Sequence, residues 1–385
     1  MSSKIKPNKI QIKEIKEVKK KPLVIWHLLS NRWFSAISAY AINTARSLEL
    51  EGHTCIFTPL QGSPAEQHAI NLGLKINAVV NFNWSQKKHL AALEKSINPD
   101  IIVVYGGPET FLSRFIIKDR TVLARFRGDQ CKIKYKIQQK LQAWSHSHID
   151  LFITPSKRLN QLYQGMYKSK PVKTIPLGVD TQVFQPRSYG KPENGSRPKI
   201  LIFGRLDPVK GHEAFIEIFA SMLELWKKSR LEKETPILQI VGKPANTSVL
   251  QILDKAQKMD LKVGYDIEVN PEYIKNVPDL LSQACLGVIS SLASEEICRV
   301  AQEFLLCGTP VFVSGVGALN EVLSFKEAGL SYKNMPTLES AETLFSFVQQ
   351  SARETQKEKQ ARAQEAKKLF SLEQMGRALN ECLLE

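Results

Sequence analysis

Short apolar runs alternate with longer segments of helical spacing along most of the chain. Apolar runs of this length are typical of strands buried on both faces of a sheet, and in the first half they cover residues 23–26, 55–58, 78–80, 101–105, 121–127 and 151–154. Segments with helical spacing lie between them, at residues 36–50, 67–72, 89–97, 109–115, 132–144 and 157–163. The repeated order of strand, loop, helix and strand predicts a doubly wound parallel sheet.

A second alternating block follows a segment rich in Ser, Gly, Pro and Asn, which is typical of a linker. Its predicted strands are 199–203, 237–241, 267–269, 286–289 and 311–313, and its predicted helices are 212–226, 248–259, 278–283, a solvated helix at 352–368 and a last helix at 372–384. The length of 385 residues suits two domains. The expected division is a basic flexible arm (1–21), a first domain (22–186), a linker (187–198), a second domain (199–368) and a C-terminal helix (369–385) able to cross back to the first domain.

Two cations lie between the first predicted strand and the first predicted helix of the second domain. Gly204 and Arg205 follow the strand at 199–203, and Lys210 and Gly211 precede the helix. A glycine lets a ligand approach the backbone, and fixed cations near a helix N-terminus suit a diphosphate. The alternative interpretation is a solvated loop. Gly242, at the end of the strand at 237–241, is a further candidate of the same kind.

Two glutamates mark the stretch between the predicted strands at 286–289 and 311–313. Glu295 and Glu303 lie eight positions apart, a little over two helical turns, so both can face the same side. Two carboxylates on one face, close to strand ends, can hold a polyol.

Polar residues of the first domain are candidates for a second ligand. Asn31, Arg32 and Ser35 lie in the loop after the first strand, where open parallel sheets bind ligands. Arg127 and Asp129 end the strand at 121–127, and a guanidinium with a carboxylate suits sugars and phosphates. A purely structural loop and an internal Arg–Asp ion pair are the respective alternatives.

The formal net charge of +15 is concentrated in the N-terminal half. One cluster comprises Lys4, Lys6, Lys9, Lys13, Lys16, Lys19, Lys20 and Lys21, and a second comprises Arg114, Lys118, Arg120, Arg125, Arg127, Lys132, Lys134, Lys136 and Lys140. Such a surface suits phosphates or an anionic membrane, and a solvated tail with a basic helix is the alternative.

The remaining composition bounds the compartment. The six cysteines show no Cys-x-x-Cys pair and no metal spacing, which predicts reduced thiols and no metal site. No apolar run approaches the roughly 20 residues that span a bilayer, and the N-terminus lacks the apolar core of a secretory signal. We therefore expect a cytoplasmic protein, peripheral on the inner face of the cytoplasmic membrane.

Several of these motifs together resemble the retaining, nucleotide-sugar-dependent glycosyltransferases of family 4, the group 1 transferases. The motifs are Ile175 to Pro186, Gly204-Arg205 with Lys210-Gly211, the pair Glu295 and Glu303, Gly308-Thr309-Pro310-Val311, and more loosely Leu48 to His53. The resemblance spans residues 22–385 and is most specific in the second domain. It implies the GT-B architecture, in which two Rossmann-like domains face each other across a cleft, the first for the acceptor and the second for the donor.

The resemblance also implies roles by position. Arg205 and Lys210 would neutralise the donor diphosphate and act in catalysis with Glu295, without an essential metal or other cofactor. Glu295 would bind hydroxyls of the donor sugar, helped by backbone N–H groups near Ile297, Cys298 and Arg299. Glu303 would bind the ribose, and the diphosphate itself would help to deprotonate the acceptor, so no general base is assigned.

The chain departs from the family pattern at two loops. The first loop of the first domain reads Asn31-Arg32-Trp33-Phe34-Ser35 where the family has paired glycines. The sequence Glu295-Glu296-Ile297-Cys298 replaces the usual Glu-Gly-Phe-Gly, which predicts an extra carboxylate, Glu296, beside the sugar pocket.

The predicted function is transfer of a hexose or heptose from a UDP-, GDP- or ADP-linked sugar to a saccharide or lipid-linked acceptor. The expected setting is lipopolysaccharide, capsule or glycolipid assembly, with an anionic membrane surface as partner and no nucleic acid. One alternative is another enzyme of the same architecture, a nucleotide-sugar epimerase or a phosphorylase. The other is a non-enzymatic basic protein that binds lipid or nucleic acid.

Overall fold

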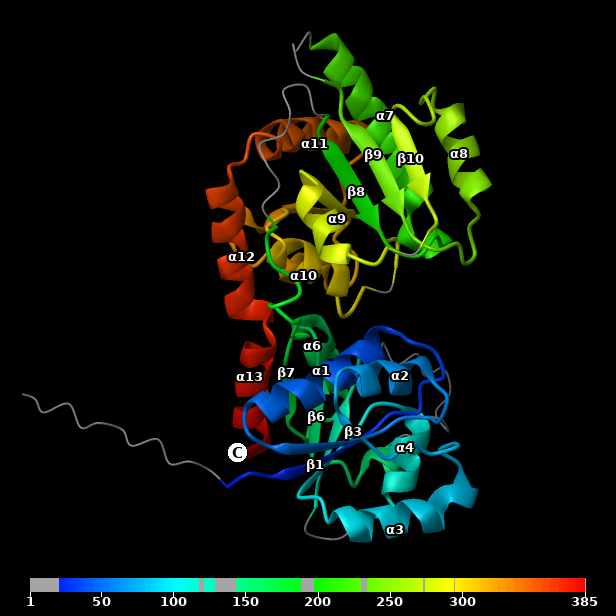
Figure 1. The fold of residues 1–385 in the computed structure, drawn as a ribbon, viewed down its shortest axis with the longest axis vertical. Coiled ribbons are helices and arrows are strands. Elements are labelled where there is room, and N and C mark those ends of the chain that lie inside the picture. The colour runs from blue at the N-terminus through cyan, green and yellow to red at the C-terminus, as the bar shows by residue number, and fades with distance from the viewer. Residues whose placement is uncertain are drawn as a thin grey trace, which may run out of the picture.

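The computed structural model describes residues 21–117, 121–128, 143–187, 197–229, 234–272, 274–293 and 295–384. Within them the chain forms two sheets in which every pair of strands is parallel (Figure 1). The predicted arm (1–21) lies almost wholly outside the described residues. So do Asp129 and most of the predicted helix at 132–144.

The first sheet has seven strands in the order β3-β2-β1-β4-β5-β6-β7. They are β1 (Val24–Leu28), β2 (Thr54–Thr58), β3 (Lys75–Ile76), β4 (Ile101–Val104), β5 (Val122–Phe126), β6 (Leu151–Thr154) and β7 (Val172–Thr174). The helices of this domain are α1 (Ala36–Leu50), α2 (Pro64–Asn71), α3 (Lys87–Ile97), α4 (Gly107–Ser113) and α6 (Lys157–Met166), with the 3₁₀ turn η1 (Trp84–Gln86). Strand order reverses beside β1, so the loops after β1 and β4 open at the switch point where such sheets bind ligands.

The second sheet has six strands in the order β10-β9-β8-β11-β12-β13. They are β8 (Lys199–Phe203), β9 (Ile237–Val241), β10 (Ile267–Asn270), β11 (Leu286–Ile289), β12 (Val311–Val313) and β13 (Gly329–Ser331). The helical elements are η2 (Pro208–Lys210), α7 (His212–Lys228), α8 (Val249–Lys258), α9 (Val277–Gln283), α10 (Arg299–Leu306), η3 (Leu319–Val322), η4 (Lys326–Ala328), α11 (Thr337–Ser351), α12 (Gln356–Phe370) and α13 (Leu372–Leu384). The predicted parallel, doubly wound architecture in two domains is confirmed.

The C-terminal helix α13 returns to the first domain, as predicted, and packs along α1 (Figure 1). A Cβ on Gly376 would lie 2.5 Å from the carbonyl oxygen of Ser47, so only glycine allows this close approach. His53 Nε2 and Asn380 Oδ1, 3.0 Å apart, join the same two segments. One cluster of buried apolar side chains runs from the first sheet through α13 and α12 to α10, which couples the two domains.

One predicted strand was misplaced, and one predicted helix is less solvated than expected. The strand expected at 78–80 is β3 at Lys75–Ile76, and Val79 forms only an isolated bridge with Leu60. This edge strand is defined by its pairing with β2, and its exposed Lys75 gives no apolar signal. The helix expected to be solvated, α12, buries one face, because Arg362 is 4% exposed and donates to Glu354 and to the carbonyl oxygens of Gly308 and Glu327.

Candidate active site

The carboxyl ends of β8 and β9 approach each other closely at two predicted site residues. The N–H of Gly204 donates to the carbonyl oxygen of Val241 at 3.0 Å, and that of Gly242 donates to Asn270 at 2.9 Å. A Cβ on Gly242 would lie 1.8 Å from the carbonyl oxygen of Gly204. Gly242 therefore has a packing reason to be glycine, and both glycines line the cavity between the domains.

The Arg205 side chain is 61% exposed at the edge of this cavity. Its guanidinium lies 3.4 Å from Asp207, whose carboxylate also accepts from the Val209 N–H at 3.1 Å and from Asn246 at 2.9 Å. The Val209 hydrogen bond, helped by Asn246 and Arg205, lowers the pKa of Asp207 below its ordinary value. A guanidinium has five N–H groups and this one is mostly exposed, so Arg205 keeps donors available for an anion.

The structure brings Lys210 and Glu295 together although they are 85 positions apart. The Lys210 ammonium donates to Glu295 Oε1, and Ser291 Oγ donates to the same carboxylate oxygen at 2.6 Å. Ser290 Oγ donates to the carbonyl oxygen of Lys210 at 2.7 Å, which holds η2 against the end of β11. An ammonium has three N–H groups, so this ion pair leaves Lys210 able to donate to a phosphate as well.

The backbone from Glu295 to α10 is held in an unusual conformation. The carbonyl oxygen of Glu295 accepts from the Ala318 N–H at 2.7 Å, and a Cβ on Gly317 (φ 63°) would lie 2.3 Å from that oxygen. Cys298 adopts φ 56° and begins α10 without a side-chain cap. Its thiol pKa is raised well above the ordinary value by burial and by the charges of nearby carboxylates, Glu295 first. Cys298 is therefore a buried, unreactive thiol that shapes the loop.

Arg299 and Glu303 face the cavity between the domains. Arg299 Nε donates to Glu303 Oε1 at 2.6 Å, and the Glu303 side chain is only 3% exposed. The cavity has a volume of about 1030 Å³ and is bordered by both domains. Among its described lining residues, the cations are Arg46, Arg205, Lys243, Lys275 and Arg299, and the carboxylates are Asp180, Glu272 and Glu303. This excess of cations suits an anionic ligand.

A smaller cavity of about 190 Å³ adjoins the first. Lys210, Ser291, Glu295 and Cys298 line it, and Gly204 and Arg205 border both cavities. Of the two predicted cations, Arg205 thus lies between a small compartment at Glu295 and a large one at Glu303, and Lys210 lines the small compartment.

Glu296 does not line either of these cavities. Its carboxylate accepts from Arg158 Nη1 of α6 in the first domain, and it lines a separate cavity of about 370 Å³. The loop thus turns this side chain toward the first domain, and its placement beside a sugar pocket stays a prediction.

A second carboxylate of the second domain also reaches α6. Glu321 accepts from the backbone N–H groups of Lys157 and Arg158 at 2.7 and 2.8 Å, at the first turn of the helix. Together with Arg158 and Glu296, these contacts form a link between the domains, here called the interdomain clasp. Sequence reasoning missed it because its members are more than a hundred positions apart with no local motif.

The predicted first-domain residues separate into two groups. Arg32 lines an open cavity of about 490 Å³ at the carboxyl ends of the strands. Asn31 instead donates to Ser35 Oγ at 3.0 Å, and Ser35 forms the capping box of α1 with Ser38. Asn31 and Ser35 therefore order the helix start next to the cavity.

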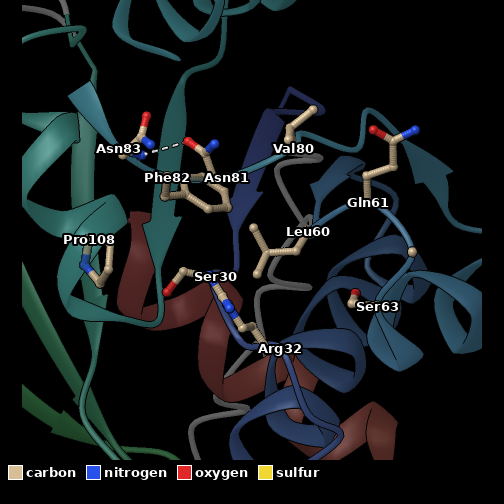
Figure 2. Close-up of a pocket in the computed structure, with 11 residues that line it drawn as sticks. Ser30, Arg32, Leu60, Gln61, Ser63, Val80, Asn81, Phe82, Asn83 and Pro108 are labelled. Carbon is tan, nitrogen blue, oxygen red and sulfur yellow. Dashed lines mark hydrogen bonds between the residues drawn. The ribbon is translucent and has the colours of Figure 1, made fainter. Parts of the chain in front are cut away.

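Figure 2 shows the other residues that surround this cavity. They are Ser30, Leu60, Gln61, Gly62, Ser63, Val80, Asn81, Phe82, Asn83 and Pro108. Amide and hydroxyl groups beside an aromatic ring suit a saccharide. Sequence reasoning missed the two asparagines and Gln61, since isolated amides in loops carry no motif.

Arg127 is buried and donates through Nε and Nη2 to the Tyr163 hydroxyl at 2.9 and 2.6 Å. Its neighbour Gly128 faces the second domain, because a Cβ there would lie 3.4 Å from Cδ1 of Ile297. The end of β5 thus meets the loop that follows Glu295. Asp129 lies outside the described residues, so the alternative of an Arg127–Asp129 ion pair stays a prediction.

Two further observations concern ions and membranes. Among the described residues, no group of three or more His, Cys, Asp and Glu side chains could hold a metal ion. No helix in that part of the chain is both long and apolar enough to cross a bilayer.

Comparison with solved structures defines the fold. A glycosyltransferase from Rickettsia africae superposes with a TM-score of 0.75 at 16% identity, covering 94% of this chain and 98% of that chain. HepE from Anabaena, in complex with UDP and glucose, superposes with a TM-score of 0.68 at 16% identity, covering 94% and 99%. The chain therefore has the GT-B fold.

The family comparison is specific to the second domain. Residues 186–368 match the family Glycosyl transferases group 1. A D-inositol 3-phosphate glycosyltransferase of Paenarthrobacter aurescens is 27% identical over 164 residues, which span 41% of this chain and 38% of that relative. This chain accordingly carries a group 1 glycosyltransferase domain.

Proposed function

We propose that this protein is a retaining glycosyltransferase that moves a hexose or heptose from a nucleotide sugar to a saccharide or lipid-linked acceptor. The observation that carries the proposal is the position of Arg205 between the two compartments, with Lys210 beside Glu295 in the smaller one, in a segment that matches the group 1 family. A diphosphate beside Arg205 would direct its nucleoside toward Glu303 and its sugar toward Glu295. A UDP-, GDP- or ADP-linked sugar has this order of parts.

Charge development in the reaction matches these side chains. As the bond between the sugar and the diphosphate breaks, negative charge grows on the leaving oxygen, and Arg205 and Lys210 stabilise it without a resident metal. Glu295 accepts hydroxyl donors of the sugar while it also orients Lys210. The acceptor oxygen attacks from the face that the diphosphate leaves, and its proton passes to the diphosphate, so the anomeric configuration is retained.

The proposed setting is the assembly of lipopolysaccharide, capsule or glycolipid on the inner face of the cytoplasmic membrane. The open cavity at Arg32, with its amides and hydroxyls, supports a saccharide acceptor. The cationic N-terminal half supports an anionic lipid surface.

A donor panel tests the proposal. The full chain is incubated with UDP-, GDP- and ADP-sugars and candidate acceptors, with release of the nucleoside diphosphate and the anomeric configuration of the product as readouts. We expect release from one nucleotide class and retention of configuration. Inversion would contradict the retaining mechanism, and interconversion of the donor sugar without an acceptor would favour an epimerase.

A variant ties the activity to the site. Glu303→Gln removes the carboxylate proposed to accept from the ribose, so we expect affinity for the nucleotide to fall by about tenfold in calorimetry. Glu268→Gln is the matched control, since Glu268 accepts a hydrogen bond from Gln239 on the exposed face of the same domain. Equal affinity in Glu303→Gln and wild type would contradict the assigned role.

A further inference from the structure

Four aromatic side chains gather on the outside of the first domain. Trp84 begins η1, Phe111 and Phe115 lie one turn apart at α4 and just beyond it, and Trp144 lies in a later segment. Ring centroids are 5.0 Å apart for Trp84 and Phe115, 5.3 Å for Phe111 and Phe115, and 6.1 Å for Phe111 and Trp144. We call these four residues the aromatic patch.

The aromatic patch is open to solvent. Trp84 is 56% exposed, Trp144 45% and Phe111 40%. Large aromatic rings normally provide core packing, and a contiguous exposed group of them marks an interaction surface. Because the four rings pack against one another, the aromatic patch is one continuous apolar surface. A surface for single-stranded nucleic acid would instead present separate rings on which single bases stack.

Cations frame the patch. The Lys87 ammonium lies 4.6 Å from the centre of the Trp84 ring, and the Arg114 guanidinium lies 4.4 Å from that of Trp144. In the segments 82–93, 107–117 and 143–148, the ionic side chains other than histidine are Lys87, Lys88, Arg114 and Glu109. Glu109 is completely buried and accepts from the Ser30 N–H at 3.1 Å, so the exposed charge of these segments is positive.

The patch continues into the cavity of Figure 2. Asn83 lines that cavity and caps η1, whose first residue is Trp84. Pro108 lines it from the first turn of α4, which carries Phe111. The polar cavity and the aromatic patch with its flanking cations are thus built in part from the same two short elements, η1 and α4.

We propose that the aromatic patch is the surface by which this protein docks on an anionic lipid bilayer, with the adjoining cavity receiving the saccharide head of a lipid-anchored acceptor. Indole and phenyl rings belong at the interface between headgroups and acyl chains, and flanking cations attract anionic headgroups. The part that concerns the acceptor rests on the proposed function. The docking surface itself does not depend on it.

Vesicle partition of the full chain tests the surface. The vesicles are phosphatidylcholine with and without phosphatidylglycerol, and the variants are Trp84→Ser, Phe111→Ser and their combination. The double variant has less ring area to bury in the bilayer, so its partition onto vesicles should fall by on the order of tenfold. Lys87→Ser should lower it about fivefold at low salt, with a smaller effect at high salt.

Tyr265→Ser is the matched control. Tyr265 is 51% exposed and packs under the Arg197 guanidinium at 4.1 Å, but it precedes β10 in the second domain, far from α3 and α4 (Figure 1). We expect its partition to equal that of wild type. Equal partition of wild type and the double variant, or capture of single-stranded nucleic acid or of a protein through the patch in place of vesicles, would overturn the proposed surface.

A parallel titration separates this inference from the proposed function. The same proteins are titrated with UDP, GDP and ADP in the absence of vesicles, where wild type and the double variant should bind one nucleotide equally. If wild type binds vesicles through the patch but no nucleotide, the proposed function fails and the docking surface stands. If it binds nucleotide but the patch variants partition normally, the docking surface fails alone.

Discussion

Several helices of the two domains begin differently, although α4 of the first domain starts at Gly106 without a side-chain cap and α8 of the second has a capping box at Ser248. In the first domain α1, α2 and α6 start at Ser35, Ser63 and Ser156, whose hydroxyls accept backbone N–H groups of the first turn. In the second, α7 and α10 start at Gly211 and Cys298, both with positive φ and without a side-chain cap. Uncapped first turns keep N–H donors for an anion, and capped ones do not.

We expect the anion at the second domain, because two uncapped helix starts and both predicted cations lie there. There the helix starts are combined with Arg205 and Lys210, whereas the first domain offers amides, hydroxyls and Arg32. The linings of the cavities therefore differ: Arg205 and Lys210 line the small cavity of the second domain, and amides and hydroxyls with Arg32 line the cavity of the first. Each experiment below tests one side of this difference.

The largest effect is expected from Lys210→Ala. The change removes a cation beside the diphosphate and leaves the Glu295 carboxylate, with a side chain only 12% exposed, without that partner. Transfer should fall by about 100-fold or more in kcat/KM. Lys255→Ala, which breaks the ion pair with Glu217 between α8 and α7, is the matched control and should retain near-wild-type transfer. Similar losses in both variants would place the effect in folding instead of the site.

Acid should destabilise the first domain more steeply than the second. Burial lowers the pKa of His27 to about 3 and, with Arg125 and Arg127 nearby, that of His146 to about 3, from an ordinary value of 6.5. In the unfolded chain these two histidines therefore bind protons below about pH 6.5, whereas in the folded domain they bind them only near pH 3. Stability falls by about 1.4 kcal/mol per pH unit for each such histidine as pH drops through this window.

Urea unfolding followed by tryptophan fluorescence measures this slope, because Trp26, Trp33, Trp84 and Trp144 all belong to the first domain. His27→Gln should flatten the dependence of unfolding free energy on pH, whatever its effect on stability at pH 7. His89→Gln, at an exposed position of α3, is the control. An unchanged slope in His27→Gln would show that this histidine titrates normally in the folded protein.

Arg32→Ala tests the first-domain side of the comparison. Loss of a charged donor in the open cavity should raise KM for the acceptor about tenfold, with the affinity for nucleotide unchanged. Lys75→Ala, an exposed cation at the edge of the same sheet, is the control. A loss of nucleotide affinity in Arg32→Ala would mean that the first domain also contacts the donor.

The interdomain clasp should give the smallest effect. The Arg158 side chain is 43% exposed, so its coupling to Glu296 in a double-mutant cycle with Arg158→Ala and Glu296→Gln should be about 0.5–1 kcal/mol. Glu321→Ala removes two hydrogen bonds at the start of α6 and should lower the free energy of unfolding by about 1 kcal/mol. Stopped-flow transfer assays measure the cycle, and a coupling of zero would show that Glu296 does not position the loop from Glu295 to Cys298.

Much of the fold was predictable because it depends on local patterns. The apolar runs at β1, β4 and β8 and the helical spacing of α1 are each contained within a few residues, as is the Gly-Arg-x-x-x-x-Lys-Gly spacing after β8. The edge strand β3 was misplaced, since its position depends on pairing with β2 and not on its own apolarity.

Local patterns were enough to predict the alternation of strands and helices and the residues that follow each strand, because periodicity and turn residues act over short distances. The folded structure was needed to show which distant groups meet. Lys210 reaches Glu295 because β8 and β11 are neighbours in the sheet. Glu296 reaches Arg158 because the two domains pack with α6 against the loop that follows Glu295. Strand order and domain orientation arise from the summed packing of the whole chain, so no local motif records them.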